Sequence, residues 1–155
     1  MLTTHRCWFI EYLPPAIETM AKTKDSHFVA VGREDGSLEV WSTTNWVMLL
    51  KCPGIQDLDI RRVHWVEADY RGPVWVGSNP LAYWTTGGGE VMRWVITTGL
   101  NGSVIEWDLK TRLPERWVDL GSAVWDSKVK DNEEIVCVCE DGSTRIVNLD
   151  EFRES

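Results

Sequence analysis

Three stretches of this chain repeat one another, and this repetition limits what the chain can fold into. The first runs from Phe28 to Trp46 as FVAVGREDGSLEVWSTTNW, and its pattern returns at 95–109 and at 134–149. Each copy has a short apolar run, an Asp-Gly or Asn-Gly pair, a serine, and then an alternating run. A tight two-residue turn needs positive φ at its centre, which such pairs adopt cheaply. The repeat therefore predicts three β-hairpins, turning at Asp35-Gly36, Asn101-Gly102 and Asp141-Gly142.

The residues around the hairpins predict further strands. Residues 16–23 and 46–52 flank the first hairpin, residues 60–67 and 115–120 flank the second, and 123–130 precede the third. An additional N-terminal strand is expected at 4–12, stopped by Pro14-Pro15. Four antiparallel strands with tight turns make one propeller blade, whose usual repeat is about 40–45 residues. We therefore expect blades at about 16–54, 60–120 and 121–150.

The second predicted blade is too long by one segment. Gly36 and Gly102 are 66 residues apart, whereas Gly102 and Gly142 are 40 apart. Leaving out residues 68–92 brings the first spacing to 41. We interpret 68–92 as an inserted loop between the first two strands of this blade, because loop closure costs grow slowly with length.

These patterns predict an all-β fold, a partial β-propeller of about two and a half to three four-stranded antiparallel blades. Closed propellers have about four to eight blades. We therefore expect the chain to be part of a larger propeller: a truncated or partial product, or one piece that another chain completes. An open arc would leave apolar blade faces exposed.

Composition narrows the function classes. The chain has 155 residues, ten Trp and a formal net charge of −8, so it has no general attraction for nucleic acid. No run approaches the ~20 apolar residues of a membrane span, and the N-terminus lacks the pattern of a secretory signal. We expect the four cysteines to be reduced thiols in a β-core of a nuclear or cytosolic protein.

No catalytic or metal-binding pattern emerges. His5, His27 and His64 stand apart from one another, with no Cys or carboxylate at metal-ligand spacing. The glycine run at 87–89 lacks the rest of a phosphate-binding motif, and Ser78 lacks the glycine of a nucleophile elbow. The sequence predicts a protein that is not an enzyme and has no cofactor, metal or small-molecule substrate.

The inserted loop offers a candidate partner contact. Its composition is rich in Gly and Pro and carries four aromatic residues, which suits an interaction surface. These are Tyr70, Trp75, Tyr83 and Trp84. The alternative is an extension that packs on its own blade, or an error in the gene model.

The hairpins resemble WD repeats, since Trp107-Asp108 ends the third strand of one blade. The other copies have Trp41-Ser42 and Val147-Asn148, and no Gly-His pair opens any repeat. The hydrogen-bond network typical of such repeats is therefore expected to be incomplete, so that rigidity rests more on packing.

A narrower resemblance is to the cirhin family of nucleolar WD-repeat proteins. It rests on His5-Arg6 with Phe9, on Tyr12 and on PPAI at 14–17, followed in order by VGREDGSLEVW, TGLNGSVIEWDL, GSAVWDSKV and VCEDGSTRIVNL. This chain would correspond to the beginning of the first of two propellers.

The resemblance implies a scaffold in the transcription-coupled U-three-protein A subcomplex of the small-subunit processome. The implied partners are other protein subunits, with pre-ribosomal RNA contacted mainly indirectly and no membrane, and the implied location is the nucleolus of the nucleus. The alternative is a WD-repeat adaptor outside ribosome assembly, such as a substrate receptor of a ubiquitin ligase.

Overall fold

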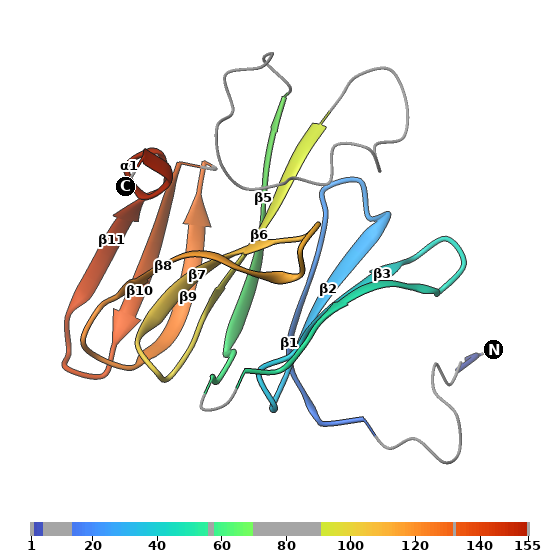
Figure 1. Ribbon diagram of the computed structural model, residues 1–155, viewed down its shortest axis with the longest axis horizontal. Helices are drawn as coiled ribbons and strands as arrows, with labels where there is room; N and C mark the ends of the chain where they lie inside the picture. The colour runs from blue at the N-terminus through green and yellow to red at the C-terminus, as the bar shows by residue number, and fades with distance from the viewer. Residues whose placement is uncertain (1, 5–13, 56–57, 70–90, 132, 155) are drawn as a thin grey trace.

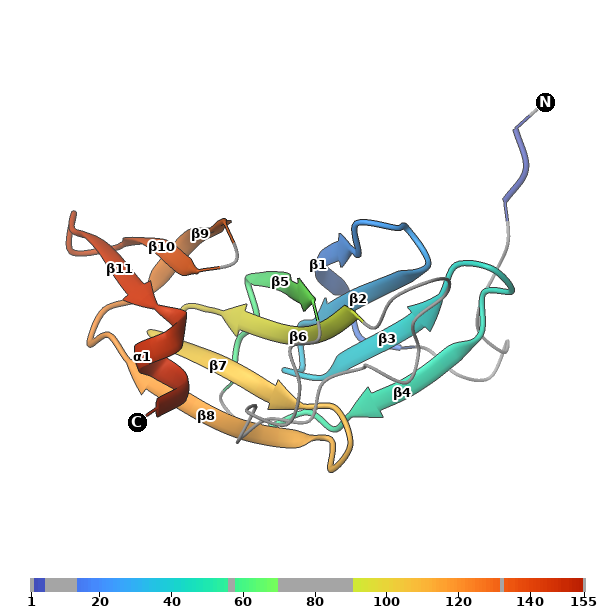
Figure 2. The same cartoon turned by 90° about the horizontal axis from the view of Figure 1, so that it is seen from above.

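The chain forms three antiparallel sheets that stand side by side in an arc (Figure 1). The structure is a computed structural model and describes residues 2–4, 14–55, 58–69, 91–131 and 133–154. The predicted strand at 4–12 and nearly all of the predicted insertion lie outside these residues. Seen from above, the sheets follow one another along the chain, with the two described ends at opposite sides of the arc (Figure 2).

The first sheet is the simplest of the three, because its strands pair in chain order. It consists of β1 (Ile17–Lys22), β2 (Phe28–Arg33), β3 (Leu38–Ser42) and β4 (Met48–Cys52). Strand β2 is buried along its whole length, as expected for an apolar run with neighbours on both edges.

The second and third sheets repeat this order. The second contains β5 (Arg62–Asp69), β6 (Val91–Thr98), β7 (Ser103–Asp108) and β8 (Leu113–Asp119), and the third contains β9 (Val124–Lys130), β10 (Glu134–Cys139) and β11 (Thr144–Asn148). Repeated sheets of this kind, arranged as blades, confirm the prediction of an all-β, partial β-propeller.

A short helix follows the third sheet. Helix α1 (Leu149–Glu154) packs against β11 and β8, and buries Leu149 and Phe152. The sequence analysis predicted no element here. Asn148 caps the helix by accepting a hydrogen bond from the N–H of Glu151, 3.1 Å away, and acidic residues occupy the first turn.

The hairpin turns differ from the two-residue type that was predicted. The N–H of Gly36 donates to the carbonyl of Arg33, and the N–H of Arg33 donates to the carbonyl of Ser37, both at 3.0 Å. Only the glycine has positive φ, at 79°, whereas Asp35 does not. This is a three-residue loop that ends in a left-handed residue, and an Asp-Gly pair suits it as well as the shorter turn.

The start of β4 was also predicted too early. Trp46 lies in the turn before the strand with φ of 55°, and the strand begins at Met48. A run of apolar residues does not reveal where a turn ends, because the turn tip itself carries apolar side chains here.

Apolar side chains fill the two interfaces between neighbouring sheets. The first interface joins the first and second sheets through side chains such as Leu38, Val40, Val95 and Trp107. The second interface joins the second and third sheets through side chains such as Trp94, Ile96, Ile135 and Cys137. Each interface is a layer between two pleated faces, so successive residues of the middle sheet serve alternate interfaces.

Candidate protein-interaction surfaces

The hairpin signature residues have a local structural role. The Oδ1 atom of Asp35 accepts hydrogen bonds from the N–H of Ser37 (2.9 Å) and from its hydroxyl (2.5 Å). Burial raises the pKa of Asp35, but the bonds from Ser37 outweigh it and lower the pKa below its ordinary value. Asp141 has the same bonds from Ser143, which lower its pKa.

The second hairpin keeps a weaker form of this arrangement. Asn101 accepts a bond from the N–H of Ser103 at 3.3 Å. Gly102 and Gly142 repeat the positive φ of Gly36, at 84° and 85°. The Asp-or-Asn, Gly, Ser sequence is thus explained by turn geometry, without any role in chemistry.

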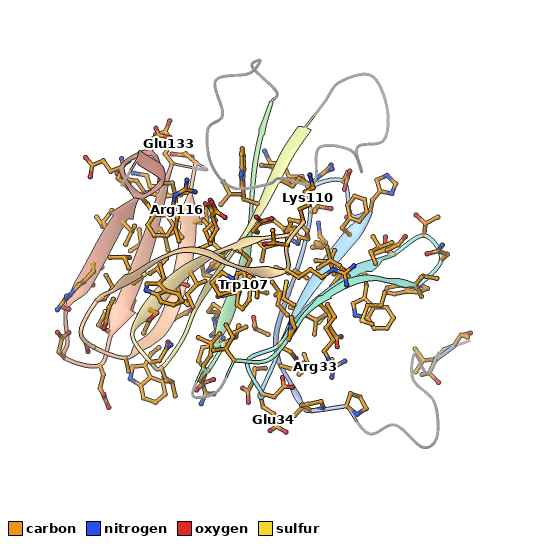
Figure 3. All side chains as sticks on the ribbon, viewed as in Figure 1. Arg33, Glu34, Trp107, Lys110, Arg116 and Glu133 are labelled. Carbon is orange, nitrogen blue, oxygen red and sulfur yellow. The ribbon has the colours of Figure 1, made fainter. Side chains whose placement is uncertain are left out.

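The two repeat tryptophans have different partners. Trp107 lies in the interior of the molecule, and its indole N–H donates to the hydroxyl of Thr97 at 2.9 Å (Figure 3). Trp41 instead donates to the carboxylate of Glu39 at 3.0 Å. Asp108 accepts bonds from the backbone of Lys110 and Thr111 at 2.9 and 3.1 Å, which fixes the turn between β7 and β8.

Buried ion pairs reinforce the first sheet and the first interface. Arg33 pairs with Glu39 through Nε at 3.0 Å within the first sheet. Arg93 of β6 reaches across the first interface to Asp25 at 2.7 Å, and pairs with Glu67 at 2.8 Å. Burial raises the pKa of Asp25, but hydrogen bonds from Thr23 and His27, and the charge of Arg93, lower it overall. The sequence analysis missed these pairs, because nothing in the spacing of 25, 67 and 93 links them.

The second interface has a polar link of its own. The Nε2 atom of His64 lies 2.8 Å from the hydroxyl of Ser127, which lies 2.7 Å from the hydroxyl of Thr98. Burial lowers the pKa of His64 to about 4, helped by the positive charge of Lys128. A half-buried neutral imidazole bonded to one serine hydroxyl fits a structural role.

The described cysteines lie in the core. Cys52, Cys137 and Cys139 are buried and free of disulfides. Burial raises the pKa of Cys52 to about 12 and that of Cys137 to about 11. These thiols are therefore protonated at neutral pH and poor nucleophiles.

The described part of the chain contains no grouping of three metal-ligating side chains, and no helix within it is long and apolar enough to cross a membrane. Exposed apolar patches of the described residues are the candidate surfaces for protein partners. The predicted contact residues Tyr70, Trp75, Tyr83 and Trp84 fall outside the described residues.

One apolar patch is the open face of the third sheet, defined here as Val136, Val138 and Ile146. Val136 pairs with Ile146 across β10 and β11, while the alternate residues of β10 face the second interface. Val138 and Ile146 are 50% and 62% exposed, and Trp125 of β9 is also half exposed. No neighbouring sheet covers this face among the described residues, as expected for an open arc.

A second patch is the tip of the hairpin between β3 and β4. Trp46, Val47 and Met48 are consecutive and exposed. The equivalent residues of the tip between β7 and β8 are Arg112, Leu113 and Pro114, of which Leu113 is 57% exposed, so only the first tip carries an exposed aromatic residue. Trp46 was predicted to begin a strand, so this exposed tip was not predicted. The turn-forming sequence Thr-Thr-Asn just before three apolar residues could have indicated it.

Two four-stranded blades and a three-stranded one, joined through apolar interfaces, define a WD-repeat β-propeller, of which this chain forms an arc. The chain is similar to the β-propeller domain of Cps50 (Swd1) from Myceliophteria thermophila, with a TM-score of 0.61 and 15% identity over 89% of this chain and 37% of that one. It is likewise similar to the WD40 domain of Toxoplasma gondii coronin, with a TM-score of 0.61 and 12% identity over 86% of this chain and 31% of that one. These likenesses establish the fold.

Among curated proteins, the chain is similar to U3 small nucleolar RNA-associated protein 4. Identity is 26% to the Saccharomyces cerevisiae protein over 96% of this chain, 29% to the Schizosaccharomyces pombe protein over 94%, and 23% to the human homolog over 94%. These relatives support the cirhin-family resemblance. The chain spans 18–19% of their length, and no family model matches it.

Proposed function

We propose that this chain is part of a non-catalytic β-propeller scaffold that works in small-subunit ribosome biogenesis, in the nucleolus. The observation that carries the proposal is similarity along 94–96% of the chain to proteins named for association with U3 small nucleolar RNA, in two yeasts and in human. The fold supports the scaffold role, because propeller blades present rigid loops and edges in many directions.

The scaffold works through contacts with other protein subunits of a processome subcomplex. The net charge of −8 supports contact with pre-ribosomal RNA mainly through those subunits, since a direct interface needs many basic side chains to neutralise phosphates. The open face of the third sheet and the exposed tip between β3 and β4 supply apolar surface for such contacts.

The open arc itself is completed by further blades, which continue the same chain or come from another one. The next blade packs as the third sheet packs on the second, where Ile135 and Cys137 fill the interface. The open face with Val136 and Ile146 would contact the residues of the next sheet that correspond to Ile135 and Cys137. Blade boundaries at about 16–54, 60–120 and 121–150 belong to this proposal, as does the insertion predicted at 68–92, although residues 68–69 and 91–92 at its two ends are paired in β5 and β6.

Affinity purification of the protein, tagged at its own locus, tests the proposal. The expected result is co-purification with small-subunit assembly factors and with pre-ribosomal RNA, and loss of the RNA once those factors are stripped with salt. Co-purification with ubiquitin-ligase subunits and no pre-ribosomal RNA would instead support an adaptor outside ribosome assembly.

A further inference from the structure

The tip between β3 and β4 presents three large apolar side chains on a fixed backbone. Trp46, Val47 and Met48 are 53%, 51% and 42% exposed. The N–H of Ser42 donates to the carbonyl of Val47 at 2.9 Å, and the N–H of Val47 donates to the side chain of Asn45 at 3.3 Å. A bond of 2.9 Å from the N–H of Thr43 to the carbonyl of His27 ties the turn to the loop between β1 and β2.

Trp46 occupies a backbone conformation that favours glycine. Its φ is 55°, in the left-handed region, which an L residue with a bulky side chain rarely adopts. Arg112 has the same conformation, φ of 65°, at the equivalent position of the next blade. That turn has the charged residues Lys110 and Arg112, with the exposed Leu113 at the position equivalent to Val47. The conformation is therefore a property of this turn in both blades, and the first blade differs by placing an exposed tryptophan in it, which points to a functional contact.

The charge around the tip identifies the kind of partner. Residues 40–50 contain no charged side chain, and residues 34–50 contain no Lys, Arg or His. The hairpin itself therefore supplies no basic residue for the phosphates beside a base stacked on Trp46, and the adjoining loop carries Lys24 and His27 together with the acidic Asp25. An uncharged apolar pocket on a protein matches this tip in polarity.

We propose that Trp46, Val47 and Met48 anchor a protein partner by inserting into an apolar pocket free of formal charge. Tryptophan is among the residues most often found to dominate interface energies, especially when it fills a pocket. Because the turn is already fixed by its own hydrogen bonds, little conformational freedom is lost on binding. This inference rests on one part of the proposed function, namely that the chain works by binding other proteins.

A photo-crosslinking experiment in cell extract tests this. The full chain, tagged at its own locus, carries benzoyl-phenylalanine at position 46 or, as a control, at position 112. The expected result is crosslinking from 46 to one protein segment rich in aliphatic and aromatic residues, equally in 0.15 and 0.5 M salt, and at least about tenfold less from 112. Crosslinks to RNA, or equal yields from both positions, would overturn the proposal.

Matched variants complete the test. Trp46→Gly removes the side chain and suits the backbone, so the protein stays folded. The amount of the partner identified by crosslinking that co-purifies with this variant, without any crosslinker, falls about tenfold or more. Val47→Thr keeps the shape of the side chain and lowers recovery less. Arg112→Gly makes the same backbone change on the next blade and leaves recovery unchanged. Unchanged recovery with Trp46→Gly would overturn the proposal. A partner outside ribosome assembly would contradict the proposed function but not the anchor.

Discussion

At the scale of single residues, His64 makes stability depend on pH. Its pKa is lowered to about 4 in the folded chain by burial, against 6.5 for a free imidazole. Between these values the unfolded chain binds a proton that the folded chain does not. Stability is therefore complete above pH 6.5 and falls as the pH drops toward 4, by on the order of 3 kcal/mol.

We expect His64→Gln to remove this part of the pH dependence, because glutamine can bond to Ser127 without titrating. Urea unfolding of both proteins between pH 7.5 and 4.5 measures it. The pKa values of Asp25 and Asp126 are lowered in the folded chain, so protonation of these carboxylates destabilises both proteins at lower pH. The difference between the two curves of unfolding free energy against pH therefore isolates the histidine. Parallel curves would mean that His64 is not the titrating group.

Residue-level prediction from the sequence succeeded where a side chain acts on its own neighbours. Asp35 and Asp141 accept bonds from the serine two residues on, as their turn positions indicate. Arg93 could not be assigned to its partners, because the pairing of β5 with β6 brings it to Glu67 and only the packing of the first two sheets brings it to Asp25.

At the scale of elements, the hairpin turns should differ in tolerance to substitution. Gly36 and Gly142 share positive φ, but a Cβ added at Gly36 would lie 2.7 Å from the carbonyl oxygen of Leu58, whereas nothing lies within 4 Å at Gly142. We expect Gly142→Ala to cost about 1 kcal/mol from backbone strain alone, and Gly36→Ala to cost about 2 kcal/mol more. Denaturant unfolding of both variants measures the difference, and equal losses would argue against the tight contact at Gly36.

The inter-sheet ion pairs should also be unequal. Arg93, whose side chain is 4% exposed, crosses the first interface to Asp25 and also pairs with Glu67 of its own sheet, whereas Arg62 and Asp126 cross the second interface with side chains 42% and 46% exposed. We expect Arg93→Met to cost about 3–5 kcal/mol, because it removes the cationic partner of the nearly buried Glu67 and of Asp25, while the N–H of Lys24 still donates to Glu67. Arg62→Met should cost at most about 1 kcal/mol. Unfolding free energies measure both, and similar costs would show that burial does not set the value of these pairs.

Strands were predictable as elements, because alternation and turn residues are local signals. The ends of elements were less so. Trp46 looked like the start of β4 but belongs to the turn, and residues 149–154 form a helix where no element was predicted. The first depends on a hydrogen bond between Ser42 and Val47, and the second on burial of Leu149 and Phe152 against the sheets.

At the scale of the whole molecule, the arc leaves an apolar face on the third sheet. We expect the isolated chain to self-associate through it, with a weight-average mass that rises with concentration in sedimentation equilibrium. The double variant Val138→Lys, Ile146→Lys should remain monomeric. Thr44→Lys, Thr111→Lys adds the same charge on exposed turns and serves as the control. Equal self-association of all three proteins would place the contact elsewhere.

The repeat in the sequence predicted the blades and the open arc, since each follows from strand count and spacing. The function could not be obtained in this way, because a propeller serves many functions. It rests on similarity to U3 small nucleolar RNA-associated protein 4, of which the chain spans about a fifth.

The central claim is a role in making the small ribosomal subunit, and rapid depletion of the tagged protein tests it most directly. Precursor and mature ribosomal RNAs are measured by pulse labelling within the first hour. The proposal predicts that new small-subunit RNA falls several-fold and its early precursors accumulate, while large-subunit RNA continues. Unchanged synthesis of both RNAs, or an equal decline of both, would contradict it.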